Sequence, residues 1–275
     1  MINSDIRVAI VGAGGRMGRE LIKVFSRHNS VILGAVLEKN GSDIIGIDAG
    51  ELVGIGRLNI IICDDLINVL DKFDILIDFT SPKGTIHHLS ICKKYEKAMI
   101  IGTTGFNETE QKLIKKASEI LPIVLSVNFS VGVNLLFKLL EKTAKVIGEY
   151  SDIEIIEAHH KHKIDSPSGT ALEMADVISK SISSNCNFKN YKVFDSKCIT
   201  YKKENKKIGF SVIRAGYILG EHTAIFINIG DRIEITHKTL SRITFANGVV
   251  KACLWLKGKN HGLYSMKDVL NLKNL

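Results

Sequence analysis

The chain has 275 residues, of which 45% are hydrophobic and 24% charged, and its formal net charge is +8. This length allows two domains, and the composition is that of an ordinary soluble globular protein. No apolar run approaches the roughly 20 residues that a membrane-spanning helix needs. The cysteines include no CxxC pair, which argues against a thiolate zinc site and a disulfide framework (positions 63, 92, 186, 198 and 253). A reduced, cytoplasmic protein with no membrane partner is expected.

The first fifteen residues, MINSDIRVAIVGAGG, contain no basic segment followed by an apolar one, so a secretory signal is not expected. The positive charge is spread along the chain, and lysines are dense only at residues 187–207. No recognisable nucleic-acid motif accompanies them. A solvated lysine-rich surface is favoured over nucleic-acid binding, and the charge also suits anionic substrates and phosphates.

Apolar runs alternate with helical patterns through the first half of the chain, which predicts a parallel α/β sheet. Residues 40–57 are rich in glycine and are expected to form an irregular loop. The predicted strands are Arg7–Val11, Val31–Leu37, Leu58–Cys63, Ile75–Phe79, Met99–Ile101 and Ile123–Val127, and the predicted helices are Arg16–His28, 83–95 and 107–120.

The second half begins with a long predicted helix, and the change of pattern near 130–150 indicates a domain junction. Gly230 and Asp231 join two apolar runs, as is typical of an antiparallel hairpin. The predicted helices are 133–148, a segment from Ala171 to Ile182, and 242–257, and the predicted strands are Ile153–Ile156, Phe210–Ala215, Ala224–Ile229 and Arg232–His237.

A glycine turn follows the first strand and precedes the first helix. Gly12, Gly15 and Gly18 have G-x-x-G-x-x-G spacing, although the strict G-x-G-x-x-G pattern fails at Met17. Glycine lets the backbone approach a pyrophosphate at the helix N-terminus, and Glu38 closes the second strand, where an acid can bind ribose hydroxyls. A plain tight turn and a surface acid are the alternatives, but the combined order favours dinucleotide binding.

Lys39 follows Glu38 and is a candidate partner for the 2′-phosphate of NADP, or an ordinary solvated lysine. Two further turns end apolar strands, at Gly102–Gly105 and at Ser126–Phe129. Ligands of open α/β sheets lie beyond the carboxyl ends of the strands, so both turns are expected at the cofactor. Each is also compatible with a simple loop.

The stretch Glu157–Ala171, EAHHKHKIDSPSGTA, places histidines and lysines before a helix start. A helix N-terminus offers free N–H groups to anions, so the stretch suits a small acidic substrate. A polar loop with a well-capped helix is an equally weighted alternative. His159 and Lys163 are close enough in sequence to converge on one ligand, and an imidazole can transfer protons near neutral pH. His162 and Lys161 are interpreted as structural or surface residues.

Several motifs in the same order are found in the 4-hydroxy-tetrahydrodipicolinate reductase family, which the chain resembles over nearly its whole length. They are the glycine turn, GTTGF at 102–106, NFSVGVN at 128–134, HHKHKIDSPSGTA, GEHTAIF at 220–226, EITHK at 234–238 and FANG at 245–248. The resemblance implies an α/β fold with a Rossmann-type parallel-sheet domain at 1–129 plus 241–275. It also implies a substrate-binding and tetramerisation domain of mixed sheet at 130–240.

The resemblance further implies an enzyme of lysine and diaminopimelate biosynthesis. NADH or NADPH would reduce 4-hydroxy-tetrahydrodipicolinate to tetrahydrodipicolinate with loss of water, in a homotetramer. Its catalytic residues fall on His159 and Lys163, and its substrate contacts on His160, Gly169 and Thr170. Its cofactor contacts fall on Gly12, Ala13, Gly14, Gly15, Arg16, Met17, Glu38, Lys39, Gly102, Thr103, Thr104, Ser126, Val127, Asn128 and Phe129. No metal is implied.

The chain departs from the family pattern at a few positions. Lys39 stands where arginine is common, which should weaken bidentate recognition of a phosphate. Ser81 stands where a basic residue occurs in relatives, so the resemblance assigns no cofactor contact to this position. Ser166 replaces the usual alanine, and Ser126 with Val127 replaces a smaller pair.

Two other classes of protein fit parts of the pattern. A metal-dependent hydrolase could use His159, His160 and His162, although strand alternation would put the first two on opposite faces and no convincing carboxylate set accompanies them. A non-enzymatic nucleotide-sensing module would explain the glycine turn, but it would leave the polar cluster at 157–171 without a role.

Overall fold

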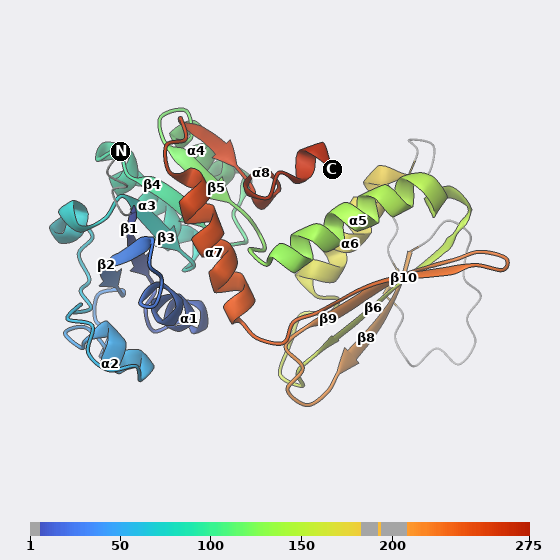
Figure 1. Ribbon diagram of the computed structural model, residues 1–275, viewed down its shortest axis with the longest axis horizontal. Coiled ribbons are helices and arrows are strands. Elements are labelled where there is room, and N and C mark those ends of the chain that lie inside the picture. The colour runs from blue at the N-terminus through green and yellow to red at the C-terminus, as the bar shows by residue number, and fades with distance from the viewer. Residues whose placement is uncertain (1–5, 183–191, 194–207) are drawn as a thin grey trace. The chain divides into compact units, whose positions relative to one another are not determined.

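The computed structural model describes residues 6–182, 192–193 and 208–275. They form two compact units: unit 1 contains residues 6–131 and 242–275, and unit 2 contains the described residues of 132–241 (Figure 1). Most of the predicted lysine-rich surface at 187–207 lies outside the described residues, as do Cys186 and Cys198. Within the described part, no helix is long and apolar enough to cross a membrane.

Unit 1 is built on a six-stranded sheet in which every neighbouring pair is parallel. The spatial order is β11-β5-β4-β3-β1-β2, so the order reverses between β3 and β1. This is the doubly wound pattern that the alternating sequence predicted. The strands are β1 (Ile6–Val11), β2 (Val31–Leu37), β3 (Ile75–Asp78), β4 (Ala98–Ile101), β5 (Pro122–Leu125) and β11 (Gly262–Tyr264).

Helices cover both faces of this sheet (Figure 1). Side chains of alternate strand residues divide between two apolar clusters: Val8 and Ile10 pack with α1 and α7, whereas Ala9 and Val11 pack with α3 and α4. The helices are α1 (Arg16–Phe25), α2 (Ala49–Val53), α3 (Pro82–Lys94), α4 (Glu108–Ala117), α7 (Ile243–Leu256) and α8 (Met266–Val269), and the 3₁₀ turns are Ile67–Lys72 and Leu272–Asn274.

The predicted strand Leu58–Cys63 is wrong. This segment makes only two isolated bridges, Leu37 to Cys63 and Asp48 to Ile61. The buried Asp48 carboxylate accepts hydrogen bonds from the N–H groups of Leu58 and Ile60, and it also caps α2. A side chain therefore takes the backbone donors that a continuous strand would give to a neighbour.

Unit 2 contains a five-stranded mixed sheet in the order β10-β9-β6-β8-β7. β6 pairs in parallel with β8 and antiparallel with β9, and β9 and β10 form the predicted antiparallel hairpin. The strands are β6 (Asp152–His159), β7 (Lys192–Val193), β8 (Ile208–Arg214), β9 (Glu221–Ile227) and β10 (Arg232–Lys238), and the helices are α5 (Val131–Ile147) and α6 (Gly169–Ser181), with a 3₁₀ turn at Gly148–Tyr150.

Helices α5 and α6 lie along one face of this sheet and close an apolar core over it (Figure 1). Ile153 and Ile155 of β6 belong to that core. Because side chains alternate along a strand, Glu157 and His159 face the same side, beyond the last apolar residue. The face that makes the core therefore ends in a buried polar cluster.

Candidate active site

The glycine turn of unit 1 positions the start of α1 against the end of β1. Gly12 has φ +84°, a conformation that glycine adopts without strain. A Cβ on Gly18 would lie 2.1 Å from the Gly12 carbonyl oxygen, so only glycine fits there. The N–H groups of Arg16, Met17 and Gly18 have no acceptor among the described residues. The turn and the helix end therefore present backbone N–H donors, the groups that helix N-termini offer to anions.

Glu38 follows β2 and reaches back to the turn. Its carboxylate accepts from the N–H of Gly14 at 2.8 Å and from the N–H of Lys39 at 2.9 Å. The side chain of Lys39 is exposed beside it. The acid is therefore held against the glycine turn, and the cation follows it at the surface.

A buried network that sequence reasoning missed holds the Gly102–Thr104 loop. Asp78, at the end of β3, is fully buried, and its Oδ1 accepts from the Thr80 hydroxyl at 2.7 Å. Its other oxygen lies 2.8 Å from His88 Nδ1. The Thr103 hydroxyl oxygen accepts from the Thr80 N–H at 3.0 Å. Two strand ends are thereby fixed side by side, with Thr103 buried and Thr104 exposed.

The segment Ser126–Phe129 follows β5 and packs under α7. The Ser126 hydroxyl donates to the Asn128 carbonyl at 2.8 Å. A Cβ on Gly248 of α7 would lie 1.8 Å from the Phe129 carbonyl oxygen, which accounts for the glycine of the FANG motif. Val127 is 67% exposed. The turn thus has a fixed backbone and presents one apolar side chain to solvent.

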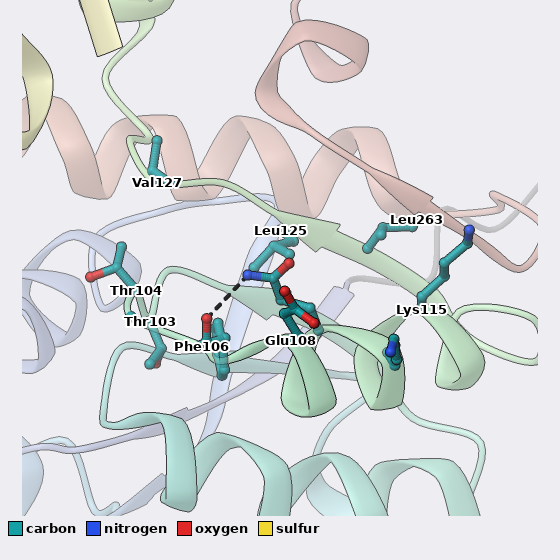
Figure 2. Close-up of a pocket in the computed structure, with 11 residues that line it drawn as sticks. Thr103, Thr104, Phe106, Glu108, Lys115, Leu125, Val127 and Leu263 are labelled. Atoms are coloured by element: carbon teal, nitrogen blue, oxygen red, sulfur yellow. Dashed lines mark hydrogen bonds between the residues drawn. The ribbon is translucent and has the colours of Figure 1, made fainter. Parts of the chain in front are cut away.

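A pocket of about 500 Å³ opens beside these two turns. Thr103, Thr104 and Val127 lie toward one end, and Leu263 and Lys115 toward the other (Figure 2). Three residues from the predicted cofactor set therefore share one cavity of unit 1. The glycine turn and Glu38 do not line it.

In unit 2, the polar cluster gathers side chains from three strands and a helix start. Glu157 and His159 come from β6, Arg214 from β8 and His222 from β9. Glu157 Oε1 accepts from Arg214 Nη2 at 2.7 Å and from the Ser168 N–H at 3.1 Å, while Oε2 hydrogen-bonds His159 Nδ1. The rings of His159 and His222 meet edge to face, with centroids 5.0 Å apart.

The surroundings of the cluster favour the ionised form of Glu157 and the neutral form of His222. Burial by itself would raise the pKa of Glu157, but hydrogen bonds from His159, Arg214 and Ser168 outweigh it and lower this pKa to about 2. Burial, and then the charge of His159, lowers the pKa of His222 to about 4. At neutral pH the cluster therefore contains an ionised Glu157 and a neutral His222.

Lys163, His160 and His162 follow β6 in a short turn. Lys163 Nζ lies 2.9 Å from Asp165 Oδ1, and this hydrogen bond is the largest cause that lowers the pKa of Asp165. Lys163 is also near enough to His222 to contribute to its lowered pKa. His160 is half-buried and His162 is exposed, with ring centroids 6.3 Å apart.

Helix α6 begins immediately beside this cluster. The Ser168 hydroxyl caps the helix by accepting from the Ala171 N–H at 3.2 Å. Among the described residues, the N–H groups of Gly169 and Thr170 have no acceptor. Two backbone donors and the positive end of the helix dipole are therefore available to a carboxylate.

The group of potential metal ligands that gathers in the described part of the chain is Glu157, His159 and His222. It is not the trio His159, His160 and His162 that sequence spacing suggested for a hydrolase. Arg214 already holds one oxygen of Glu157, and a guanidinium charge at that point opposes a second cation.

Sequence reasoning missed Arg214 and the role of His222, although His222 lies in the GEHTAIF motif. Each stands in phase with the apolar residues of its strand: Phe210 precedes Arg214, and Phe226 and Ala224 follow His222. A polar residue at a core-facing position was the available signal.

A doubly wound unit with a glycine turn, joined in one chain to a unit with a buried cluster of histidines and a carboxylate, is typical of a nucleotide-dependent oxidoreductase. Comparison with known families specifies it. The profile described as dihydrodipicolinate reductase, N-terminus, matches residues 6–129, and that described as dihydrodipicolinate reductase, C-terminus, matches residues 132–270. The chain belongs to the dihydrodipicolinate reductase family. It is an NAD(P)H-dependent reductase of lysine and diaminopimelate biosynthesis, acting on 4-hydroxy-tetrahydrodipicolinate.

Solved structures share the fold over nearly the full chain. Dipicolinate-bound dihydrodipicolinate reductase from Paenisporosarcina sp. TG-14 is 24% identical with a TM-score of 0.75, covering 95% of this chain and 97% of that one. Amine dehydrogenase from Mycobacterium smegmatis is 12% identical with a TM-score of 0.63, covering 96% and 95%. A probable dehydrogenase from Thermotoga maritima is 13% identical with a TM-score of 0.62, covering 97% and 93%.

Proposed function

We propose that unit 1 binds NADH or NADPH and that unit 2 binds the dicarboxylate substrate and supplies the proton. The nicotinamide nucleotide supplies a hydride when bound. Hydride addition to the substrate ring leaves an electron pair that takes up a proton, and one water is lost, giving tetrahydrodipicolinate. The observation that carries the assignment is the buried, hydrogen-bonded pair of His159 and Glu157 beside the start of α6. At that helix start, the N–H groups of Gly169 and Thr170 have no acceptor among the described residues.

The diphosphate of the cofactor would bind at residues 12–17. The lack of room for a Cβ on Gly18, the positive φ of Gly12 and the N–H groups at the start of α1 support this placement. The side chain of Arg16 is exposed at the helix start and adds positive charge near a phosphate.

The ribose near the adenine would bind at Glu38. Its carboxylate can accept from the ribose hydroxyls of NADH, whereas the exposed ammonium of Lys39 can pair with the 2′-phosphate of NADPH. A lysine is a point charge without the planar fork of an arginine, so the preference for NADPH would be modest. Use of both cofactors follows.

The nicotinamide end would bind near Gly102–Thr104 and Ser126–Phe129. Both segments follow the carboxyl ends of strands, β4 and β5. The pocket that Thr103, Thr104 and Val127 line offers an apolar surface for a planar ring (Figure 2).

One substrate carboxylate would accept from the N–H groups of Gly169 and Thr170. His160 and the ammonium of Lys163 would contact the substrate from the turn after β6, and Lys163 would exchange its ion pair with Asp165 for a substrate group. His159 would supply the proton: its side chain is only 10% exposed, and Nε2 has no hydrogen-bond partner among the described residues yet is not enclosed.

We also propose that the chain forms a homotetramer through unit 2. Ile213 of β8 and Ile227 of β9 are 47% and 42% exposed, on the face of the sheet opposite α5 and α6. Light scattering after size-exclusion chromatography tests this state. A mass four times that of the 30.4 kDa chain is expected, and a monomer would contradict it.

A coupled assay tests the proposed activity. Pyruvate and aspartate semialdehyde are condensed enzymatically in situ, and the absorbance of NADH or NADPH is followed after the chain is added. Oxidation of both nucleotides that depends on the condensed substrate is expected. Oxidation that is equally fast without aspartate semialdehyde would contradict the assigned substrate.

A further inference from the structure

Glu157 occupies a position at which the sheet pattern calls for an apolar residue. It follows Ile153 and Ile155 on the core face of β6, and its side chain is fully buried. An ionised carboxylate is costly to bury unless it is paired and hydrogen-bonded. Several polar groups must therefore pair with this one acid for it to stay ionised in the core.

Both carboxylate oxygens of Glu157 are engaged by different partners. Oε1 accepts from the guanidinium of Arg214 and from the backbone N–H of Ser168, and Oε2 is left for Nδ1 of His159. Arg214 is itself fixed, because the same Nη2 donates to the Asp165 carbonyl at 2.8 Å. The side chain of Glu157 is thus held at one end so that its other end meets the His159 ring.

An ionised carboxylate only accepts hydrogen bonds, and Glu157 is ionised throughout the neutral range because its pKa is about 2. The proton between the two groups therefore resides on Nδ1 of His159. In the neutral ring the lone pair must then be on Nε2, and in the charged ring Nε2 carries the second proton. Nε2 is the atom that is open to a ligand.

The groups around the pair are consistent with a proton on Nδ1 of His159 and an open Nε2. Arg214 approaches from β8, neutral His222 from β9 and Lys163 from the turn after β6, while His237 of β10 is the cross-strand partner of His222. Glu157 is the acid that hydrogen-bonds His159 among these side chains.

We propose that Glu157 is a positioning residue that acts through His159. It holds Nδ1 protonated, directs Nε2 to the substrate, and stabilises the imidazolium form that donates the proton, while Arg214 and the Ser168 N–H hold Glu157 in turn. This inference rests on the proposed role of His159 as proton donor, and it adds a second residue to that role.

Glu157→Gln is the primary test, because it keeps the shape and removes the charge. An amide can turn its NH₂ toward Nδ1, which would impose the opposite tautomer on the neutral ring. We expect kcat to fall on the order of 100-fold, with little change in KM. Glu154→Gln is the matched control on the same strand: its carboxylate accepts from the Ser211 hydroxyl on the other face, and kcat should stay near that of the parent.

A readout independent of activity separates positioning from general damage. Nitrogen-15 NMR of histidine-labelled protein distinguishes Nδ1–H from Nε2–H rings, and the His159 signal is assigned by its absence in His159→Gln. The unaltered chain should show neutral His159 as the Nδ1–H tautomer, and Glu157→Gln should shift it toward Nε2–H. An Nε2–H ring in the unaltered chain would overturn the proposal even if Glu157→Gln failed to fold.

The double variant Glu157→Gln/His159→Gln completes the test. If Glu157 acts only through His159, the double variant should be no slower than His159→Gln, within the roughly twofold scatter of such comparisons. A further tenfold loss would show an independent role and contradict the proposal. If His159→Gln itself kept normal turnover, the proposed function of His159 would fail, while the NMR result would still report on the pair.

Discussion

The Ser168 hydroxyl lies 3.0 Å from Nε2 of His222, although the two residues are 54 positions apart in the chain. Through its N–H, the same serine binds Glu157, and through its oxygen it caps α6. One small residue therefore ties the start of α6, the end of β6 and the middle of the cluster into a single unit.

Ser168→Ala should destabilise unit 2 more than an ordinary loss of a helix cap. The cap is worth about 1 kcal/mol, and leaving the buried Nε2 of His222 without a partner costs about another 1–3 kcal/mol. Urea unfolding of both proteins measures the difference. Ser81→Ala is the control, since Ser81 caps α3 from an exposed position and should cost only about 1 kcal/mol. Equal losses for the two variants would show that the bond to His222 adds nothing.

Acid should lower the free energy of unfolding over two pH ranges, set by His222 and Glu157. The folded pKa of His222 is about 4, below its usual 6.5, so its contribution is complete above pH 6.5 and is lost as the pH falls toward 4. The folded pKa of Glu157 is about 2, below 4.5, so its contribution is lost between pH 4.5 and 2. One such group changes the free energy of unfolding by at most about 1.4 kcal/mol per pH unit.

His222→Asn tests the first pH range. The slope of the free energy of unfolding against pH should flatten between pH 6.5 and 4, and the fall below pH 4.5 should remain. His261→Asn is the control, because His261 is exposed in unit 1 and its removal should leave the slope unchanged. An unaltered slope in His222→Asn would mean that the imidazole does not titrate with folding.

Lys163→Ala should lower kcat strongly, whereas Asp165→Asn should leave most of it. Lys163 is proposed to contact the substrate, and Asp165 only pairs with it at 2.9 Å in the free protein. Loss of a group that assists proton transfer typically costs about 10²–10⁴ in rate. Steady-state kinetics of both variants decide the matter, and a Lys163→Ala protein that changes only cofactor affinity would exclude a catalytic role.

Lys39→Ala should weaken binding of NADPH more than that of NADH. The exposed lysine loses a charge-assisted contact that only the 2′-phosphate can make, with an expected loss of about 1 kcal/mol or more for NADPH. Fluorescence titration of both reduced nucleotides measures this, with the exposed Lys93 of α3 as the control position. An equal loss for both cofactors would remove the 2′-phosphate role.

Much of the fold follows from local pattern. Val31–Leu37 is β2 with the predicted bounds, and α4 begins within one residue of the predicted start at 107, where Asn107 and Glu110 form a capping box. Leu58–Cys63 failed because two of its N–H donors, those of Leu58 and Ile60, go to Asp48, a side-chain contact that the apolar run does not reveal. Strand β11, with the sequence Gly-Leu-Tyr, is too short to register as an apolar run and is paired only because β5 lies beside it.

Part of the candidate site could likewise be predicted from local sequence, and part of it depends on the fold. The glycine turn and the 157–171 stretch are each a single run of residues, so the chemistry of each could be predicted from local sequence. Arg214 and His222 enter the cluster because β8 and β9 flank β6, and that order depends on sheet topology. The Asp78 network could not be predicted either. In the sequence, Asp78 is a single acid at the end of an apolar run, and its partners Thr103 and His88 come from other elements of the fold.

The direct test of the account is turnover of His159→Gln in the coupled assay, with NADH and NADPH affinities measured in the same preparation. His162→Gln, an exposed histidine three residues further along, is the control and should stay close to the parent. We predict that His159→Gln lowers kcat by roughly 100-fold or more while it binds both nucleotides normally. A His159→Gln protein with near-normal kcat would contradict the assignment of this histidine as the proton donor.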